Sequence, residues 1–120
     1  MSVKDNVITV HKVTCVVDCG IAVNPDIVRG QMEGAVMYGL TATLHGDLDL
    51  QAGAFKQSNF HDYPILRMQE APAVDVIIVD SGTAPTGVGE PGLPPIAPAV
   101  ASAVFKATGQ RLRSLPLRLS

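Results

Sequence analysis

The chain has 120 residues, of which 47% are hydrophobic and 17% charged, and its formal net charge is −2. A chain of this length forms a single domain, residues 1–120, and buries about two-thirds of its unfolded surface. It contains no run of ~18 apolar residues that could span a membrane, no export signal, and too few clustered bases and aromatic residues for a nucleic-acid surface. We therefore expect a cytoplasmic protein, or a periplasmic one if it is exported together with a partner.

The first element expected is a strand over residues 7–18, VITVHKVTCVVD, either one long strand or a strand with a bend, because the run is rich in β-branched residues. Cys15 and Cys19 lie four residues apart. On a strand their Cα atoms would be about 13 Å apart, which is beyond disulfide reach. No further ligand pair at zinc spacing is present, so we expect buried, reduced thiols and no metal site.

A helix is predicted over residues 24–45. Asn24 is suited to the N-cap, Pro25 to the first helical position and Asp26 to the first turn, and Gly46 stops the helix. Apolar and small residues recur at spacings of three and four, which predicts one buried stripe: Val28, Met32, Ala35, Val36, Gly39, Leu40 and Thr43.

Three glycines interrupt this helix, namely Gly30, Gly34 and Gly39. Each costs about 1 kcal/mol of helix stability relative to alanine. We therefore expect a neighbour to approach the helix backbone closely at these positions. A packed strand and a bound ligand are both open as that neighbour.

The middle of the chain predicts less regular structure. Residues 46–53 indicate a polar turn and a short strand, and residues 55–68 an extended stretch broken by Pro64. Residues 73–82, AVDVIIVDSG, form the clearest strand, with apolar residues at both alternations, which predicts burial of both faces.

The last elements are a glycine- and proline-rich loop and a helix over residues 95–108, apolar almost all round and stopped by Gly109, so that no free face is expected. The final residues form a last strand or trail over the surface. Residues 91–120 carry four bases and no acid, whereas residues 1–90 carry eleven acids and five bases. The fold class expected is α+β, with two main helices packed on a small mixed sheet.

The loop TGVGEPG contains a single carboxylate, Glu90. It lacks the Lys and Ser/Thr of a phosphate-binding loop and does not fit the dinucleotide fingerprint. Gly89 allows a turn and Pro91 disfavours helix at Glu90, so the loop is able to direct one acid into a cleft as a general base. The alternative is an acid that only interacts with the dipole of the following helix.

Three ordered stretches of the chain, from about Val13 to Leu117, resemble the C-terminal portion of the large molybdopterin-binding subunit of the xanthine oxidase family. They are VDCGIAVNPDIVRGQMEGAVMYGL, NFHDYPILR and PTGVGEPGLPPIAPAVASAVFKATGQRLRSLPL. Within that family the likeness is greatest to the isoquinoline 1-oxidoreductase beta subunits and to aldehyde-oxidising relatives. The resemblance implies that the chain corresponds to a fragment of a larger molybdopterin-binding domain.

The resemblance also implies roles for two motifs. The family's Gly-x-Gly-Glu turn matches residues Gly87, Val88, Gly89 and Glu90, and its glutamate is the active-site base, which removes a proton from the water-derived oxygen that attacks an electron-poor carbon.

The second motif is the family's Gly-Gln-x-Glu-Gly helix, which matches residues 30–34, and its glutamine lies against the pterin. Gly30 and Gln31 are therefore expected to bind the cofactor. An ordinary helix position is the alternative for Gln31.

In NFHDY, residues 59–63, neighbouring side chains on an extended segment point to opposite sides, so His61 and Asp62 are not expected to hydrogen-bond to each other. A structural role is favoured for this stretch; the alternative is that Phe60 or Tyr63 lines the path of an aromatic substrate. His11 and His45 have no convergent partners and are expected to be surface or satisfied residues.

The function implied is a component of a molybdenum hydroxylase that hydroxylates an N-heterocycle or an aldehyde. Its cofactor is molybdenum-molybdopterin, in the cytosine dinucleotide form, and is expected to be absent from the isolated chain. Its partners are the remaining molybdenum-subunit segments and an iron–sulfur (2Fe-2S) small subunit, and uncovered apolar surface predicts self-association of the isolated chain. The alternative is a non-catalytic folded fragment or partner-binding module.

Overall fold

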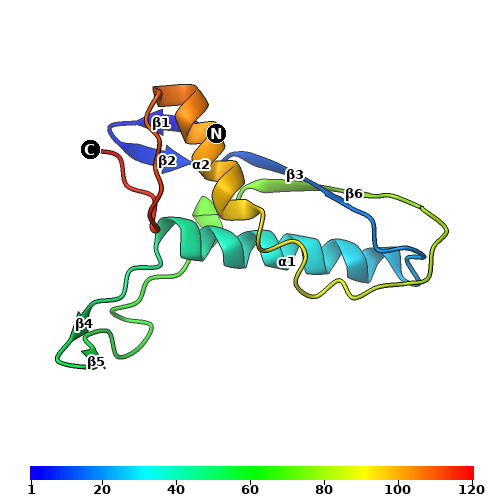
Figure 1. Ribbon diagram of the computed structural model, residues 1–120, viewed down its shortest axis with the longest axis horizontal. Helices are drawn as coiled ribbons and strands as arrows, with labels where there is room; N and C mark the ends of the chain where they lie inside the picture. Colours follow the sequence, from blue (N-terminus) through cyan, green and yellow to red (C-terminus); the bar gives the residue numbers. More distant parts are fainter.

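The computed structural model describes all 120 residues. Figure 1 shows α1 running along the length of the molecule, with α2 rising from it at one end and a small arm carrying β4 and β5 extending below. The elements are β1 (Ser2–Lys4), β2 (Val7–Thr9), β3 (Lys12–Val17), α1 (Pro25–Leu44), β4 (Leu50–Gln51), β5 (Ala54–Phe55), the 3₁₀ helix η1 (Met68–Glu70), β6 (Ala73–Ile78) and α2 (Ile96–Thr108).

The strands form three separate pairs: β1 with β2 and β4 with β5 are antiparallel, whereas β3 and β6 are parallel. This arrangement confirms the α+β class with two main helices. The strands expected in one small mixed sheet are divided among three two-stranded sheets. The bend allowed for in residues 7–18 is also present, since β2 ends at Thr9 and β3 begins at Lys12. Between them Val10 turns into the hydrophobic core.

Helix α1 begins and packs as its sequence predicts. The Asn24 side chain accepts hydrogen bonds from the backbone N–H groups of Asp26 (3.1 Å) and Ile27 (3.2 Å), which satisfies two of the free donors at the helix start. The helix ends at Leu44, and His45 is its C-cap. The predicted stripe is confirmed, because the buried residues of α1 are Val28, Met32, Ala35, Val36, Gly39, Leu40 and Thr43.

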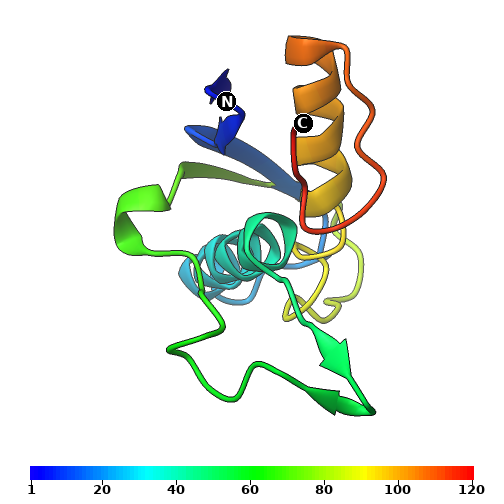
Figure 2. The ribbon, with the colours of Figure 1, turned by 90° about the vertical axis from the view of Figure 1, so that its left-hand side faces the viewer.

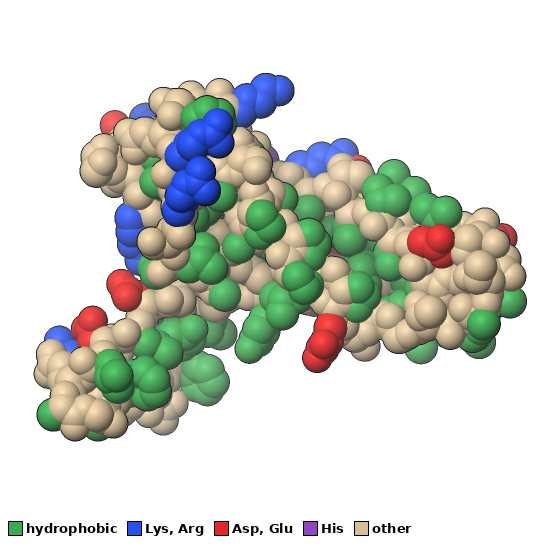
Figure 3. All heavy atoms as spheres, in the orientation of Figure 1, with side chains coloured by type: hydrophobic (Ala, Val, Ile, Leu, Met, Phe, Trp, Pro, Cys, Tyr) green, Lys and Arg blue, Asp and Glu red, His purple; other side chains and the backbone are tan.

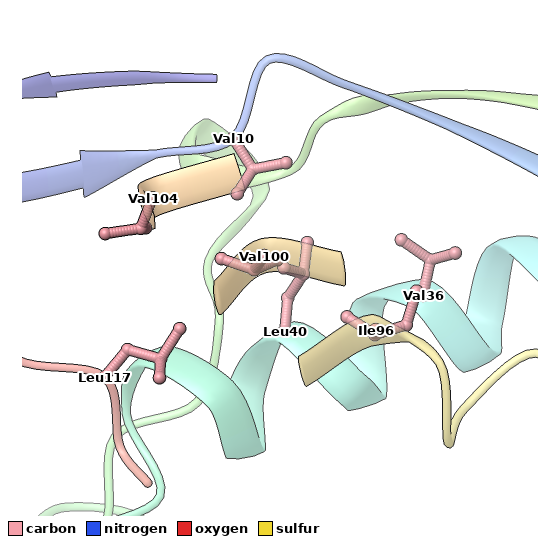
Figure 4. Close-up of a cluster of buried hydrophobic side chains, with 7 residues drawn as sticks. All are labelled: Val10, Val36, Leu40, Ile96, Val100, Val104 and Leu117. Carbon is pink, nitrogen blue, oxygen red and sulfur yellow. The ribbon is translucent and has the colours of Figure 1, made fainter. Parts of the chain in front are cut away.

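The main core lies where α1 and α2 cross. Figure 4 shows its seven buried side chains pointing toward one another from the two helices, the β2–β3 bend and the C-terminal segment: Val10, Val36, Leu40, Ile96, Val100, Val104 and Leu117. The C-terminal segment is attached to α1, because the Leu117 N–H donates to the Thr43 carbonyl at 2.8 Å. This segment trails over the helices and forms no strand.

Two expectations of complete burial are wrong for this chain. Helix α2 buries one face only, and Pro98, Ala99 and Ser102 on its other side are exposed. In the β3–β6 pair alternate residues are exposed, with Val16 at 61% and Ile77 at 52%. Figure 2, seen nearly along α1, shows the strands and α2 on one side of that helix and the β4–β5 arm on the other. No element of the chain therefore covers the outer face of the pair.

The glycines of α1 fall into two environments. A Cβ built on Gly39 would lie 2.9 Å from the Ile96 Cβ, whereas Cβ atoms on Gly30 and Gly34 would meet nothing within 4 Å. The close neighbour expected for Gly39 is thus α2, which is neither a strand nor a ligand.

No helix in the structure is both long and apolar enough to cross a membrane.

The difference between the two glycine environments gives a prediction for stability. Gly39→Val should lower the free energy of unfolding by about 1–3 kcal/mol, because the side chain forces α1 and α2 apart. The matched change Gly30→Ala should raise it by up to about 1 kcal/mol, since alanine favours the helix and its methyl group points into open space. Urea unfolding followed by circular dichroism measures both. Equal effects of the two substitutions would contradict this account of the helix crossing.

Candidate functional site

The loop that carries Glu90 is fixed at its start to the end of β3. The Ile21 N–H donates to the Thr83 carbonyl (3.0 Å), and the Thr86 N–H donates to the Cys19 carbonyl (2.9 Å). Gly20 has a positive φ of 69°, and a Cβ there would collide with the carbonyl oxygen of Ala84. Only glycine therefore allows the loop to pass this close to the strand end.

Asp18 reinforces the same junction. Its carboxylate accepts hydrogen bonds from the Gly20 N–H (3.0 Å) and the Ser81 hydroxyl (2.7 Å). These bonds favour the ionised form, so the pKa of Asp18 is lowered from its usual value, first through Gly20 and then through Ser81. Asp18 thus joins the end of β3 to the chain that follows β6.

The far end of the loop is fixed to α1. A Cβ on Gly92 would lie 2.9 Å from the Ala35 Cβ and 3.2 Å from the Met32 sulfur, so the loop backbone rests directly on the helix. Val88, half-buried, packs against the small cluster that contains Val28 and Met32. The stretch Gly87–Glu90 is therefore held between two anchors.

Within that stretch the backbone N–H groups and the Glu90 carboxylate have no partners in the chain. The backbone N–H groups of residues 87–90 donate to no acceptor in the chain, and a Cβ on Gly87 or Gly89 would meet nothing within 4 Å. Glu90 is exposed, and its carboxylate makes neither a hydrogen bond nor an ion pair with the chain. These groups are free to contact a ligand or another polypeptide segment.

The structure gives no support to the alternative in which Glu90 caps α2. The N-cap of that helix is Pro95, no side chain caps it, and its first turn contains no acid. The only local bond of Glu90 is made by its backbone carbonyl, which accepts from the Leu93 N–H at 2.9 Å. An acid five residues before the N-cap gains little from the helix dipole, which acts within the first turn.

Gln31 lies on the same part of α1. It is exposed, it directly precedes the buried Met32, and its neighbour Gly30 is open to solvent. Val88 packs against the buried cluster that contains Met32, and Gly92 lies against Met32 and Ala35, so the loop of Glu90 and the helix segment of Gln31 meet at this part of α1. Sequence reasoning identified the two motifs separately and did not predict this junction.

These residues fit one side of a polar heterocyclic cofactor. Four consecutive free N–H groups and an exposed amide match the mixed donors and acceptors of a pterin edge, and open glycines allow close approach. The chain contains no group of three or more His, Cys, Asp or Glu side chains placed to hold a metal ion.

Asp62, in the stretch 59–63, has a structural role. The Asp62 carboxylate accepts from the Ser58 and Asn59 N–H groups, which lowers its pKa, with the bond from Asn59 the larger cause. His61 makes no hydrogen bond to Asp62, but the expected opposite orientation of the two side chains is wrong: residues 60–62 form a turn, and His61 Nε2 lies 3.5 Å from Asp62 Oδ2. Cys15 and Cys19 are free thiols, and burial raises the pKa of Cys15.

Two features were missed from the sequence. His45 has a partner after all, since its Nε2 lies 3.1 Å from Glu70 Oε1, although without hydrogen-bond geometry. Sequence separation of 25 residues concealed this pair. The second is an apolar groove beside α1, lined partly by Tyr38 and Phe60. Both aromatic residues are visible in the sequence, but their proximity depends on how the arm folds back.

Comparison with known proteins identifies the family. The model of the molybdopterin cofactor-binding domain matches residues 2–72. The chain belongs to this family. It is 45% identical over 115 residues to the isoquinoline 1-oxidoreductase subunit beta of Brevundimonas diminuta, and 38% identical over 112 residues to a membrane-bound aldehyde dehydrogenase (pyrroloquinoline-quinone) of Gluconacetobacter polyoxogenes. These alignments cover 96% and 93% of the chain but only 15% and 14% of the relatives.

The fold of this molybdopterin-binding domain agrees with that of a solved enzyme. Quinoline 2-oxidoreductase from Pseudomonas putida 86 superposes with a TM-score of 0.78 at 22% identity, over 90% of this chain and 15% of that one. The family match and the 45% identity to the Brevundimonas subunit confirm the resemblance to the molybdopterin-binding subunits of the xanthine oxidase family. The family match contains Gln31 but ends before Glu90, whereas the alignment with the Brevundimonas subunit extends over nearly the whole chain.

Proposed function

We propose that the chain is a component of a molybdenum hydroxylase that hydroxylates an N-heterocycle or an aldehyde with oxygen from water, and that it contributes the active-site base and part of the pterin site. The observation that carries this proposal is the anchored stretch Gly87–Glu90, whose N–H groups and carboxylate have no partners in the chain and which belongs to a loop that packs on the part of α1 that contains Gln31.

In this mechanism the Glu90 carboxylate accepts a proton from the water-derived oxygen as that oxygen attacks the substrate carbon. When bound, the cofactor would supply the electrophilic centre that activates this oxygen and an acceptor for the hydride equivalent released when the substrate C–H bond breaks. Gly87, Val88 and Gly89 donate backbone N–H groups, and Gly30 and Gln31 present an open helix face and an amide to the pterin. The anchors at Gly20 and Gly92 hold the carboxylate in place, so that little reorganisation is needed during proton transfer.

The cofactor and partners follow from the same proposal. The resemblance to the family favours the cytosine dinucleotide form of molybdopterin. Since the chain supplies one side of the site, the remaining segments of a molybdenum subunit supply the other walls, and a 2Fe-2S small subunit takes the electrons onward. A site built from several segments cannot be preorganised by one of them.

This incompleteness predicts the behaviour of the isolated chain. Expressed alone, the 120-residue protein should contain no stoichiometric molybdenum and should oxidise neither isoquinoline nor benzaldehyde. Metal analysis and a dye-reduction assay measure both properties. Bound molybdenum at one atom per chain would contradict the proposed division of the site.

A purification from native cells tests the proposed function itself. The tagged chain should bring with it longer molybdenum-subunit segments, an iron–sulfur subunit and molybdenum, all identified by mass spectrometry and metal analysis. Recovery of the chain without molybdenum or an iron–sulfur partner would instead support the alternative, a non-catalytic module that retains the family fold.

A further inference from the structure

An apolar groove of about 570 Å³ lies between α1 and the segment that returns from the β4–β5 arm. Its lining is formed by Gly34, Met37, Tyr38, Thr41, Ala42, Phe60, Tyr63, Ile65 and Leu66. In Figure 3 hydrophobic side chains gather on the arm and on the neighbouring side of the molecule below α1. The volume is in the range of pockets that bind small organic ligands, about 300–1,000 Å³.

Aromatic residues are concentrated in this groove. The chain has only five, three Phe and two Tyr, and no Trp; three of the five, Tyr38, Phe60 and Tyr63, line it. Tyr38 and Phe60 are each 71% exposed, which is costly for large apolar rings that have nothing to cover them. Stacking on a flat aromatic ligand would cover these faces.

The aromatic wall of the groove, which is the segment that contains Phe60 and Tyr63, is held in position by hydrogen bonds at both ends. The Asp62 carboxylate accepts from the Ser58 N–H and hydroxyl and from the Asn59 N–H, at 2.9–3.1 Å, which fixes the turn that carries Phe60 and Tyr63. At the other end the Leu66 N–H donates to the Thr41 hydroxyl on α1 at 3.2 Å. The two sides of the groove are thus joined before any ligand binds, which lowers the entropic cost of binding.

One end of the groove meets the candidate site. Gly34 lines the groove and follows Gln31 by three residues, which places both on the same face of α1. A Cβ atom built on Gly34 would meet no other atom within 4 Å. Gln31 and Gly34 are both exposed and lie about one helical turn apart, so no side chain at position 34 separates Gln31 from the groove.

We propose that this groove binds planar aromatic molecules and holds the heteroaromatic substrate as it approaches the base. The aromatic specificity follows from the groove alone, whereas the role in substrate approach rests on the proposed function. The two are separable, because binding to the groove requires neither the cofactor nor turnover. The alternative occupant is a second copy of the chain, because exposed apolar surfaces also form protein–protein interfaces.

The two tyrosines make the groove directly observable, since both line it and the chain has no others. The 120-residue protein labelled with 3-fluorotyrosine should show two ¹⁹F resonances, both of which shift and saturate on titration with isoquinoline. Phe60→Ala should raise the dissociation constant for isoquinoline by about threefold to tenfold, because the stacking contact is lost. Phe55→Ala is the matched control, because Phe55 is similarly exposed at 61% and does not line the groove.

A second variant keeps the test independent of the aromatic wall. Gly34→Leu fills the groove floor, and since leucine favours helix, unfolding by urea should show no loss of stability while isoquinoline binding is lost. Three results would overturn the proposal: no saturable shift up to the solubility limit of isoquinoline, equal weakening by Phe55→Ala and Phe60→Ala, or ¹⁹F shifts that depend on protein concentration alone, which would place a second copy in the groove.

Discussion

Replacement of Glu90 by Gln in the assembled enzyme should lower turnover by about 10²–10⁴-fold while the molybdenum content is kept. Glutamine preserves the size and the hydrogen-bonding capacity of the side chain but cannot accept the proton, and the loss of a general base typically has this effect on rate. The anchors of the loop at Cys19 and Gly92 do not involve the carboxylate. The substitution should therefore leave the loop, the melting temperature and cofactor loading unchanged.

Glu70→Gln is the matched control for this experiment. Glu70 is also a surface glutamate, but its carboxylate lies beside His45 at the far end of α1 and has no place in the candidate site. Turnover and metal content measured on both variants separate proton transfer from general effects of charge. A Glu90→Gln enzyme with normal turnover would remove Glu90 as the base, and a loss of molybdenum equal to the loss of turnover would indicate a role in cofactor binding.

Leu40→Ala should give the largest change in stability, a loss of about 2–5 kcal/mol in the free energy of unfolding. Leu40 is fully buried in the cluster at the crossing of α1 and α2, to which both helices, the β2–β3 bend and the C-terminal segment contribute. Only 17 of the 120 residues are buried, so a single cavity removes a large share of the core. Since small domains are stable by only 5–15 kcal/mol, the variant should unfold at much lower urea concentration.

Leu48→Ala provides the comparison, because Leu48 is 49% exposed and outside both buried clusters. Its effect on the midpoint of urea unfolding should be within about 0.5 kcal/mol, as for most surface substitutions. If the two variants unfolded at the same urea concentration, the crossing of α1 and α2 would not be the centre of stability.

The sequence predicted the elements that are determined by local patterns. Asn24, Pro25 and the spacing of the apolar residues set the start and the buried face of α1, and Gly109 marks the end of α2 with a left-handed φ of 77°. Burial was overestimated where it depends on neighbours outside the local pattern. The run of β6 is typical of a strand covered on both faces, and the exposed Ile77 shows that residues 1–120 supply only one cover.

The candidate site was predictable as motifs but not as an arrangement. Glycines and prolines around Glu90 indicate a turn with an isolated acid, and Gln31 is found only through its motif. The packing of the loop of Glu90 on the part of α1 that contains Gln31 depends on contacts between residues about 60 positions apart, for which periodicity gives no signal. The groove was hidden for the same reason, since Tyr38 and Phe60 become neighbours only when the arm returns to α1.

The arm at residues 45–67 is an excursion within the connection from β3 through α1 to the parallel strand β6. It carries the groove wall, whereas the loop of Glu90 follows β6 and is anchored to the end of β3 and to the first half of α1. Surface excursions of this kind tolerate changes of length and sequence that buried elements do not. Under the proposed function, divergence of the arm would therefore select new ring systems while Glu90 and its anchors stay unchanged.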